Sequence, residues 1–423
     1  MDWFGHAKVD FVHSPTPRTL KTKDGKDTDL LAVCEKTTPP CHLNPWLFNG
    51  HMQTFWTVTK QHGPPVYYRR KVFEADHDSY HGTFAVDFVT KPFEETDDTL
   101  PPRTMYYKDD EFGSIGSSDN KPMLIILHGL SGGSHEIYLR HAIAPLIEQG
   151  NWEICVVNSR GCAMSKITTG ILYNARATWD VRQFVKWARK TFSNRPLFGL
   201  GFSLGANILT NYCGEEGANC QLKAAIACSN PFNLDVSSKM LQSTLIGREV
   251  YLRVMGSSMR ELADLHKETL AKHTKIDMEH VKTCTYLHEF DAAVQCPTWG
   301  YPTAGAYYRD ASSVESILAI RIPFLALQAT DDPIAVKEGL PYDEVKQNPN
   351  TIMVTTSLGG HLCWFESGGG RWHAKPVCNF LNHMAFEVDI ESVKPMTDDT
   401  DDSLPVTGSD YDPMRRKLLM VQK

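Results

Sequence analysis

Short apolar runs alternate with helix-like segments through the middle of this 423-residue chain, and this alternation constrains its fold more than any other feature. The runs are short and mostly apolar, and residues 123–127 are apolar from end to end, as expected of a strand that is covered on both faces. They lie at residues 123–127, 154–157, 196–200, 222–228, 323–327 and 352–355. Helix-like segments separate several of them, at residues 137–148, 176–192 and 204–212. This order predicts an α/β fold, with a mostly parallel central sheet and helices on both faces.

One long domain, residues 41–386, accommodates this sheet. Residues 1–40 show little periodicity and predict an N-terminal arm. Between about residues 230 and 321 the alternation stops. This segment is helix-prone up to about residue 288 and then carries Pro and Gly, which predicts a lid inserted late in the sheet. Residues 387–423 are rich in Asp and Glu and predict an acidic, disordered tail.

Two further β-prone segments precede the first apolar run, at residues 66–75 and 83–90. The cluster Asp76-His77-Asp78-Ser79 between them is typical of a hairpin turn. Residues 92–121 are rich in Pro, Asp, Gly and Ser, and they predict a surface loop before the sheet begins.

Composition excludes several classes of protein. The net charge is −7 without any Lys/Arg-rich run, so no nucleic acid partner is expected. The eleven cysteines are odd in number and include no Cys-x-x-Cys pair, which argues against a disulfide framework and against a metal site.

The N-terminus has no apolar signal-peptide core, and no apolar stretch approaches the ~18–20 residues of a membrane span. We therefore expect a cytoplasmic protein, with peripheral contact to a membrane or lipid droplet left open and the oligomeric state unknown.

A nucleophile motif follows one of the apolar runs. Gly201-Phe202-Ser203-Leu204-Gly205 matches G-x-S-x-G, directly after the strand predicted at residues 196–200 and at the start of a helix-like segment. The motif requires this strand-to-helix elbow, where glycines allow backbones to approach closely and the serine is exposed at the carboxyl edge of the sheet. Ser203 is therefore the predicted nucleophile.

A serine hydroxyl needs a base to act as a nucleophile, and enzymes with this elbow follow the chain order Ser, acid, His. Asp331 and Asp332 come just after the strand predicted at residues 323–327, and either can supply the acid. Asp332 is the first choice because it precedes Pro333-Ile334 in the turn after the strand, and Asp331 remains the alternative. His361 follows Gly359-Gly360 beyond the last strand and is the predicted base.

An oxyanion hole needs backbone N–H groups that point at the developing negative charge. The residue directly after the nucleophile, Leu204, supplies one such amide. The loop His128-Gly129-Leu130, which ends an earlier strand, supplies the other, and the Leu130 amide is the predicted donor. His128 itself is expected to shape this loop rather than to act as a base.

Several blocks together resemble α/β-hydrolase family 4, the esterase and lipase group that includes fungal medium-chain fatty acid ethyl ester synthase/esterases and acylglycerol lipases. The blocks are Asn49-Gly50-His51-Met52-Gln53-Thr54, His128-Gly129 with Gly132-Gly133, Asn158-Ser159-Arg160-Gly161-Cys162, Tyr307-Tyr308, Asp331-Asp332-Pro333 and Gly359-Gly360-His361. The resemblance spans roughly residues 45–381 and implies that the domain predicted at residues 41–386 is an α/β-hydrolase domain. Ala163 departs from the glycine found there in many members. The favoured interpretation of Asn49-Gly50-His51 is a packed turn.

The resemblance implies a serine esterase that hydrolyses medium-chain fatty acyl esters or monoacylglycerols through an acyl-enzyme, without a metal or organic cofactor. An alcohol O-acyltransferase that makes fatty acid ethyl esters with the same triad is the first alternative. The acyl-transfer signature His-x-x-x-x-Asp of some relatives of this fold is absent here, because no His in the chain has an Asp five positions further on. A non-catalytic hydrolase fold that binds lipid is the second alternative, although such proteins usually lose a triad member.

Overall fold

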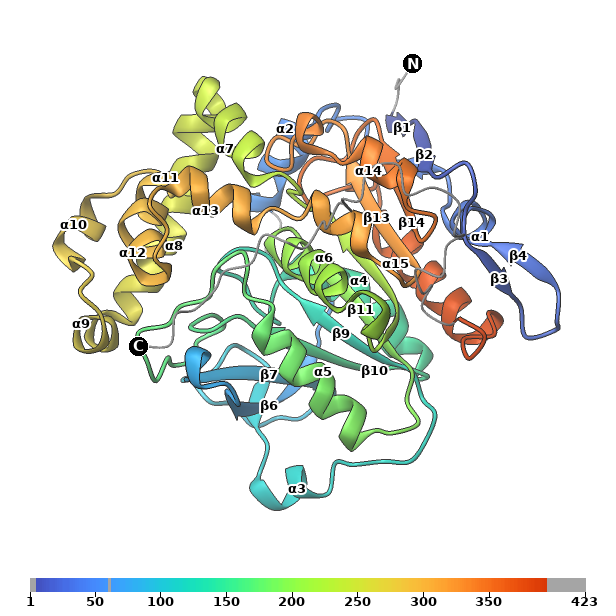
Figure 1. The fold of residues 1–423 in the computed structure, drawn as a ribbon, viewed down its shortest axis with the longest axis horizontal. Coiled ribbons are helices and arrows are strands. Elements are labelled where there is room, and N and C mark those ends of the chain that lie inside the picture. The colour runs from blue at the N-terminus through green and yellow to red at the C-terminus, as the bar shows by residue number, and fades with distance from the viewer. Residues whose placement is uncertain (1–4, 60–61, 394–423) are drawn as a thin grey trace, which may run out of the picture.

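A ten-stranded sheet lies at the centre of the computed structural model, which describes residues 5–59 and 62–393 (Figure 1). In order across the sheet the strands are β2 (Val9–His13), β14 (Thr351–Thr356), β13 (Phe324–Ala329), β12 (Leu222–Cys228), β11 (Leu197–Phe202), β9 (Met123–Leu127), β10 (Glu153–Asn158), β7 (Thr83–Thr90), β6 (Tyr67–Glu74) and β8 (Thr104–Tyr106). Pairing is parallel from β14 to β10 and antiparallel at β2–β14, β10–β7 and β7–β6. The predicted α/β fold with a mostly parallel sheet is confirmed.

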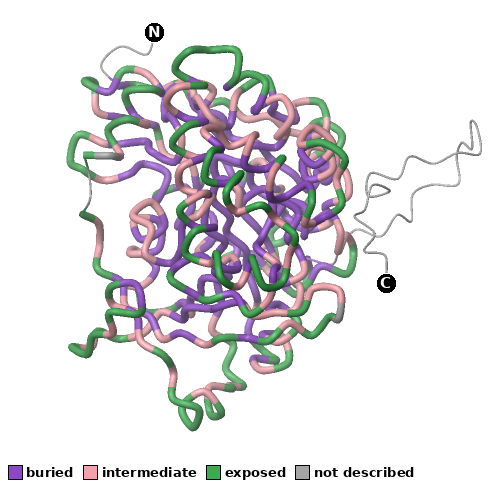
Figure 2. The backbone as a smooth tube through the Cα atoms, turned by 90° about the vertical axis from the view of Figure 1, so that its left-hand side faces the viewer, coloured by how far each residue is buried: buried purple, intermediate pink, exposed green. Residues whose placement is uncertain are grey.

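Helices cover both faces of the sheet and bury a separate apolar layer on each. One face carries α5 (Trp179–Thr191) and α6 (Leu204–Glu216), and the other carries α1 (Leu30–Thr37), α4 (Ile137–Gln149) and α15 (Ala374–Asn382). Phe184 and Leu209 pack into the first layer, and Ile143 and Leu381 into the second. Figure 2 shows these buried segments running through the middle of the molecule. Because both faces are covered, central strands such as β9 and β11 carry no polar side chain, which made them visible in the sequence.

The N-terminal arm predicted for residues 1–40 contributes to the sheet instead of standing apart from it. Strand β2 extends the sheet beyond β14, with Phe11 opposite Val354. Arg18 donates to the carbonyl of Arg321 at 2.9 Å and to Oδ1 of Asn350 at 2.7 Å. Short pairs complete this region: β1 (His6–Ala7) with β5 (Cys41–His42), and β3 (Thr19–Lys21) with β4 (Asp27–Asp29). Strands of two to five residues are too short to show periodicity.

Between β12 and β13 the chain forms a helical insertion at the place predicted for residues 230–321. Its elements are α7 (Leu234–Ser243), η5 (Gly247–Leu252), α8 (Arg253–Leu265), α9 (Lys267–His273), α10 (Met278–Thr283), α11 (Leu287–Phe290), η6 (Asp291–Gln295), α12 (Cys296–Trp299), α13 (Ala304–Ala311) and η7 (Glu315–Ala319). Much of it projects to the left of the sheet in Figure 1. The part after residue 288, which carries Pro and Gly, is helical as well. Pro297 lies in the first turn of α12, where it is tolerated, and Gly300 ends that helix at φ 76°.

The prediction of a surface loop at residues 92–121 is wrong in part. It contains β8, which pairs in parallel with β6, and the short helix α3 (Asp109–Gly113). The remaining helices are α2 (Gly50–Trp56), η2 (Thr57–Thr59), η3 (Asp78–Tyr80), η4 (Gly217–Asn219), η8 (Lys337–Gly339), α14 (Tyr342–Gln347) and η9 (His383–Glu387).

The tail predicted for residues 387–423 lies outside the described residues from position 394 onward. Before that point Val388, Ile390 and Val393 are buried in the core. Within residues 5–59 and 62–393, no helix combines the length and apolarity that crossing a membrane requires.

Candidate active site

Ser203 lies in a sharp turn between β11 and α6. Its backbone has φ 51° and ψ −119°, a conformation that is costly for a residue with a side chain. The turn closes only because its neighbours are glycines. A Cβ atom on Gly205 would lie 2.4 Å from the carbonyl oxygen of His128, and one on Gly201 would lie 2.5 Å from the Cα of Ala206. The G-x-S-x-G pattern is therefore a steric requirement of this elbow.

The structure brings Ser203, His361 and Asp332 into one hydrogen-bonded line. Nε2 of His361 lies 2.8 Å from Oγ of Ser203, and Nδ1 lies 2.8 Å from Oδ2 of Asp332. A carboxylate only accepts hydrogen bonds, so Nδ1 carries the proton and Nε2 is free to accept from the serine hydroxyl. The amides of Ile334 and Ala335 donate to Oδ1 of Asp332, each at 2.8 Å, and fix the orientation of this buried carboxylate.

Asp331, the alternative acid, faces away from this line and holds the histidine loop. Its Oδ1 accepts a hydrogen bond from the amide of Gly360 at 2.9 Å, directly before His361. Burial raises the pKa of Asp331 to about 7, although the Gly360 amide opposes this shift. The two adjacent aspartates therefore have different partners: Asp332 binds the imidazole and Asp331 binds the backbone beside it.

Helix α2, which carries the N-terminal block of the sequence, supports the same loop from the other side. Oγ1 of Thr54 accepts from the amide of His361 at 3.1 Å and donates to the carbonyl of Gly50 at 2.7 Å. A Cβ atom on Gly50 would lie 1.8 Å from the carbonyl oxygen of Asp331, so only glycine allows this contact. Asn49 caps the helix by accepting from the amide of Met52 at 2.9 Å.

The packed turn favoured for Asn49-Gly50-His51 is instead the capped start of helix α2, and that interpretation missed the contacts of this block with the active site. The sequence separates the block from His361 by about three hundred residues. The glycine directly after a helix-capping residue was the one available signal of a close backbone approach.

The loop after β9 has two of its amides bound to tyrosine hydroxyls and one amide between them. Gly129 donates its amide to Tyr138 Oη at 2.8 Å, and Ser131 donates its amide to Tyr173 Oη at 2.7 Å. Between them, the amide of Leu130 has no hydrogen-bond partner in the part of the chain that the structure describes. The amide of Leu204, at the first position of α6, has no partner within its helix either. Both amides predicted for the oxyanion hole are therefore free to donate.

His128 shapes this loop, as the sequence predicted. Its Nδ1 donates to the carbonyl of Gly129 at 2.7 Å, and its Nε2 accepts from the amide of Ser159 at 3.0 Å. Burial lowers the pKa of His128 to about 4, so the imidazole is neutral near pH 7. With both nitrogens engaged, His128 has no free nitrogen with which to act as a base.

The block that starts at Asn158 supports the loop after β9 through buried hydrogen bonds. Asn158 donates to Oδ2 of Asp87 at 2.8 Å and accepts from the amide of Ser134 at 3.1 Å. Asp87 also forms a bidentate, fully buried ion pair with Arg70, at 2.6 and 2.8 Å. This network is structural, because it joins β6, β7 and β10 to the loop without reaching Ser203.

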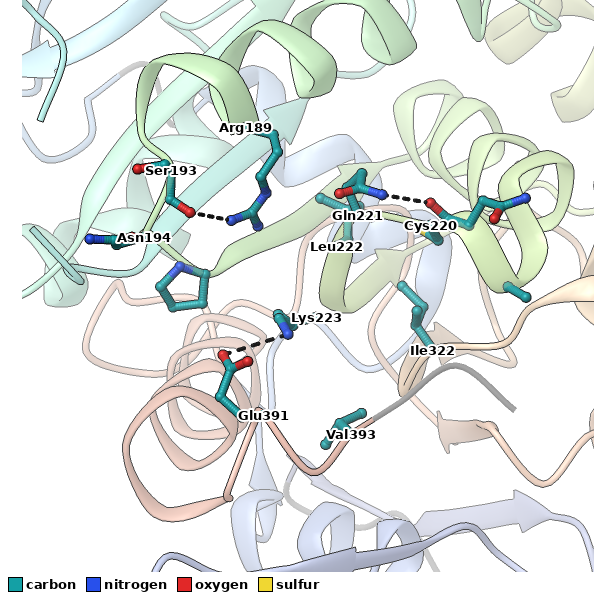
Figure 3. Close-up of a pocket in the computed structure, with 13 residues that line it drawn as sticks. Arg189, Ser193, Asn194, Cys220, Gln221, Leu222, Lys223, Ile322, Glu391 and Val393 are labelled. Carbon is teal, nitrogen blue, oxygen red and sulfur yellow. Dashed lines mark hydrogen bonds and ion pairs between the residues drawn. The ribbon is translucent and has the colours of Figure 1, made fainter. Parts of the chain in front are cut away.

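A cavity at the opposite edge of the sheet is separate from these residues (Figure 3). It is lined by Pro196, Leu222 and Ile322, which lie at the amino ends of β11, β12 and β13. Lys223 and Glu391 form an ion pair of 3.6 Å within it. Ser203 follows the carboxyl end of β11, so this cavity does not open onto the nucleophile.

Comparison with known proteins places the same region in a defined family. The family model described as the alpha/beta hydrolase fold matches residues 122–367. A monoacylglycerol lipase from Saccharomyces cerevisiae is 39% identical over 82% of this chain and 82% of that protein. Medium-chain fatty acid ethyl ester synthase/esterase 2 from the same yeast is 33% identical over 86% of this chain and 91% of its own length. A phospholipase from Homo sapiens is 27% identical over 80% and 76%. The residues matched by the family model include Ser203, Asp332 and His361.

Proposed function

This chain belongs to the α/β-hydrolase family, and from that premise we propose that it is a serine carboxylic ester hydrolase with Ser203 as nucleophile. The hydrogen-bonded line from Ser203 through His361 to Asp332 is the observation that carries the proposal. A fold that only binds lipid has no need to keep all three groups at 2.8 Å with the serine in a strained turn.

The reaction proceeds in two steps. His361 Nε2 removes the proton from Ser203 as Oγ attacks the ester carbonyl, and Asp332 stabilises the imidazolium that forms. The amides of Leu204 and Leu130 donate to the oxyanion of the tetrahedral intermediate. His361 then passes its proton to the leaving alcohol, which leaves an acyl group on Ser203. Water attacks this acyl-enzyme by the reverse sequence of proton transfers and releases the fatty acid.

Medium-chain fatty acyl esters and monoacylglycerols are the proposed substrates. The names of the two yeast relatives support this class. The insertion supports it too, because Leu204 packs against the apolar cluster that contains Tyr307 and Tyr308 of α13. An apolar wall beside the nucleophile favours an acyl chain over a polar substrate.

An alcohol O-acyltransferase is the second proposed function, because one relative is named as both a synthase and an esterase of fatty acid ethyl esters. The same acyl-enzyme transfers its acyl group to ethanol in place of water. The balance between the two reactions depends on which acceptor reaches the acyl-enzyme.

Hydrolysis of p-nitrophenyl esters from acetyl to palmitoyl, with and without ethanol, tests both functions. We expect activity that peaks at medium chain length and falls by roughly 10³-fold or more in Ser203→Ala. Ethyl ester formation in ethanol measures the transferase share. Turnover that survives in Ser203→Ala, or no turnover at any chain length, contradicts the proposal.

The proposed compartment is the reducing cytoplasm. All eleven cysteines are buried thiols, and burial raises the pKa of several, Cys363 among them to about 11. Neutral buried thiols resist oxidation and act as small apolar side chains.

A further inference from the structure

Large exposed apolar side chains gather beside the active site. Of the fourteen such residues within the described part of the chain, nine fall in two short segments. These are Trp46, Phe48, Met52, Phe55 and Trp56 in and before α2, and Met240, Leu245, Ile246 and Val254 in and around α7, η5 and α8. We name these nine residues the apolar face. Single exposed apolar residues are ordinary, but a cluster of them marks an interaction surface.

The two segments of the apolar face are neighbours in space. Nδ1 of His51 in α2 lies 2.8 Å from Oη of Tyr251 in η5, and the two rings stack with centroids 5.7 Å apart. In Figure 1 both α2 and α7 lie along the upper side of the molecule. Trp46 is 83% exposed on one segment and Leu245 is 72% exposed on the other. Residues far apart in the sequence therefore contribute to one surface.

This surface borders the loops that carry the triad. Helix α2 holds the amide of His361 through Thr54. On the other side, Tyr251 and Leu252 belong to an apolar cluster that includes Ile334, two residues after Asp332. Whatever covers the apolar face therefore lies next to the acid and the base.

The charge distribution favours a lipid surface as the partner. No Asp or Glu occurs between Glu35 and Glu74, and residues 41–59 contain no Lys, Arg, Asp or Glu, in a chain of net charge −7. In the second segment, Glu249 forms ion pairs of 2.8 Å with Arg248 and 2.7 Å with Arg253, so no acidic charge is left over in this cluster. Covering the first segment requires no charged side chain to leave water, and the arginines of the second segment can stay at the phosphate level of a lipid headgroup. Trp and Phe are the residues that accumulate where protein meets the boundary of a bilayer.

We propose that the apolar face docks the protein on a zwitterionic phospholipid surface, with Trp46, Phe48 and Phe55 inserted at the headgroup boundary. The inference rests on the proposed function in one respect, because docking next to the triad lets a lipid ester reach Ser203 without crossing water. Docking itself needs no catalysis. Because insertion is apolar and the chain is acidic overall, the binding should depend little on salt.

Flotation with phosphatidylcholine vesicles tests this docking on the full chain. We compare the wild type with the triple variant Trp46→Ser, Phe48→Ser, Phe55→Ser. The matched control is Tyr106→Ser with Phe386→Ser, two exposed aromatic residues outside the apolar face. The expected result is at least a tenfold lower partition coefficient for the triple variant. The control variant and the wild type in 0.5 M NaCl should stay within twofold of the wild type at low salt.

Two further measurements separate docking from folding and from catalysis. Hydrolysis of dissolved p-nitrophenyl butyrate should be unchanged in the triple variant, which shows that it folds, and Ser203→Ala should float like the wild type. If the wild type floats but hydrolyses no ester, the proposed function fails and docking stands. Docking is overturned if the wild type does not float, if the triple variant floats equally, or if salt abolishes binding. If neither protein floats and light scattering shows a wild-type dimer that the triple variant loses, the apolar face binds a second copy of this chain and docking on lipid is overturned.

Discussion

At the scale of single residues, two adjacent aspartates are separated by the direction in which each side chain points. Asp332 is 3% exposed and binds Nδ1 of His361, whereas Asp331 binds the amide of Gly360. Both follow the same strand and both are carboxylates, so residue type and position could not decide between them. The difference arises from the turn, in which the amides of Ile334 and Ala335 hold Asp332 towards the histidine.

The amide variants of these aspartates should behave differently. Asp332→Asn places a group that can donate next to Nδ1 and favours the wrong tautomer of His361, so kcat should fall by roughly 10³-fold or more. Asp331→Asn keeps an oxygen that accepts from Gly360, so kcat should fall less than about tenfold. Steady-state kinetics on a dissolved medium-chain ester measures both. Equal losses in the two variants would contradict the assignment of Asp332 as the triad acid.

At the scale of elements, the sequence predicted those that rest on a local pattern and missed those that rest on contacts between residues far apart in the chain. Strands such as β7 and β12 and the turn at Ser203 are local patterns, and the structure has them within a few residues of the predicted positions. Strand β2 and the support that α2 gives to His361 depend on partners hundreds of residues away. A single sequence without covariation carries no signal for such pairing, and strands this short have no periodicity of their own.

The insertion holds a buried acid whose ionisation should make stability depend on pH. Asp291 in η6 is buried, accepts a hydrogen bond from Tyr308 Oη at 2.6 Å, and has its pKa raised by burial from 3.8 to about 7. Between these two values the folded chain keeps a proton that the unfolded chain has lost. The stability due to neutral Asp291 is therefore complete below pH 4 and is lost as the pH rises to about 7.

Asp291→Asn removes this ionisation and retains an oxygen that accepts from Tyr308. We expect the unfolding free energy of the wild type to fall more steeply than that of the variant between pH 5 and pH 7, by at most about 1.4 kcal/mol per pH unit. Urea unfolding at pH 5, 6, 7 and 8 measures the two profiles. Asp331 adds a similar slope to both proteins, so the difference between them isolates Asp291. Parallel profiles would show that Asp291 keeps its charge in the fold.

At the scale of the whole molecule, the first part of the chain closes around the last part. Strand β2 completes the sheet beside β14, which leads into the loop of His361. Trp372 donates its indole N–H to the carbonyl of Pro40 at 3.1 Å, and Leu47 packs with Cys363 and Phe365. Without β2, one edge of β14 would lose its pairing and be open to other chains. The N-terminal segment therefore belongs to the folding unit that holds the triad.

Proline substitutions in β2 can test this dependence one hydrogen bond at a time. The amide of Ser357 donates to the carbonyl of Lys8 at 2.9 Å. Peptide groups alternate in direction along a strand, so the amide of Val12 faces β14 and that of Phe11 faces away. Relative to Val12→Ala, Val12→Pro should cost about 1–3 kcal/mol and lower Tm by a few degrees. Relative to Phe11→Ala, Phe11→Pro should cost much less, because that amide has no partner in the sheet. Thermal unfolding of the four variants measures both differences, and equal proline effects at the two positions would contradict the register of β2 on β14.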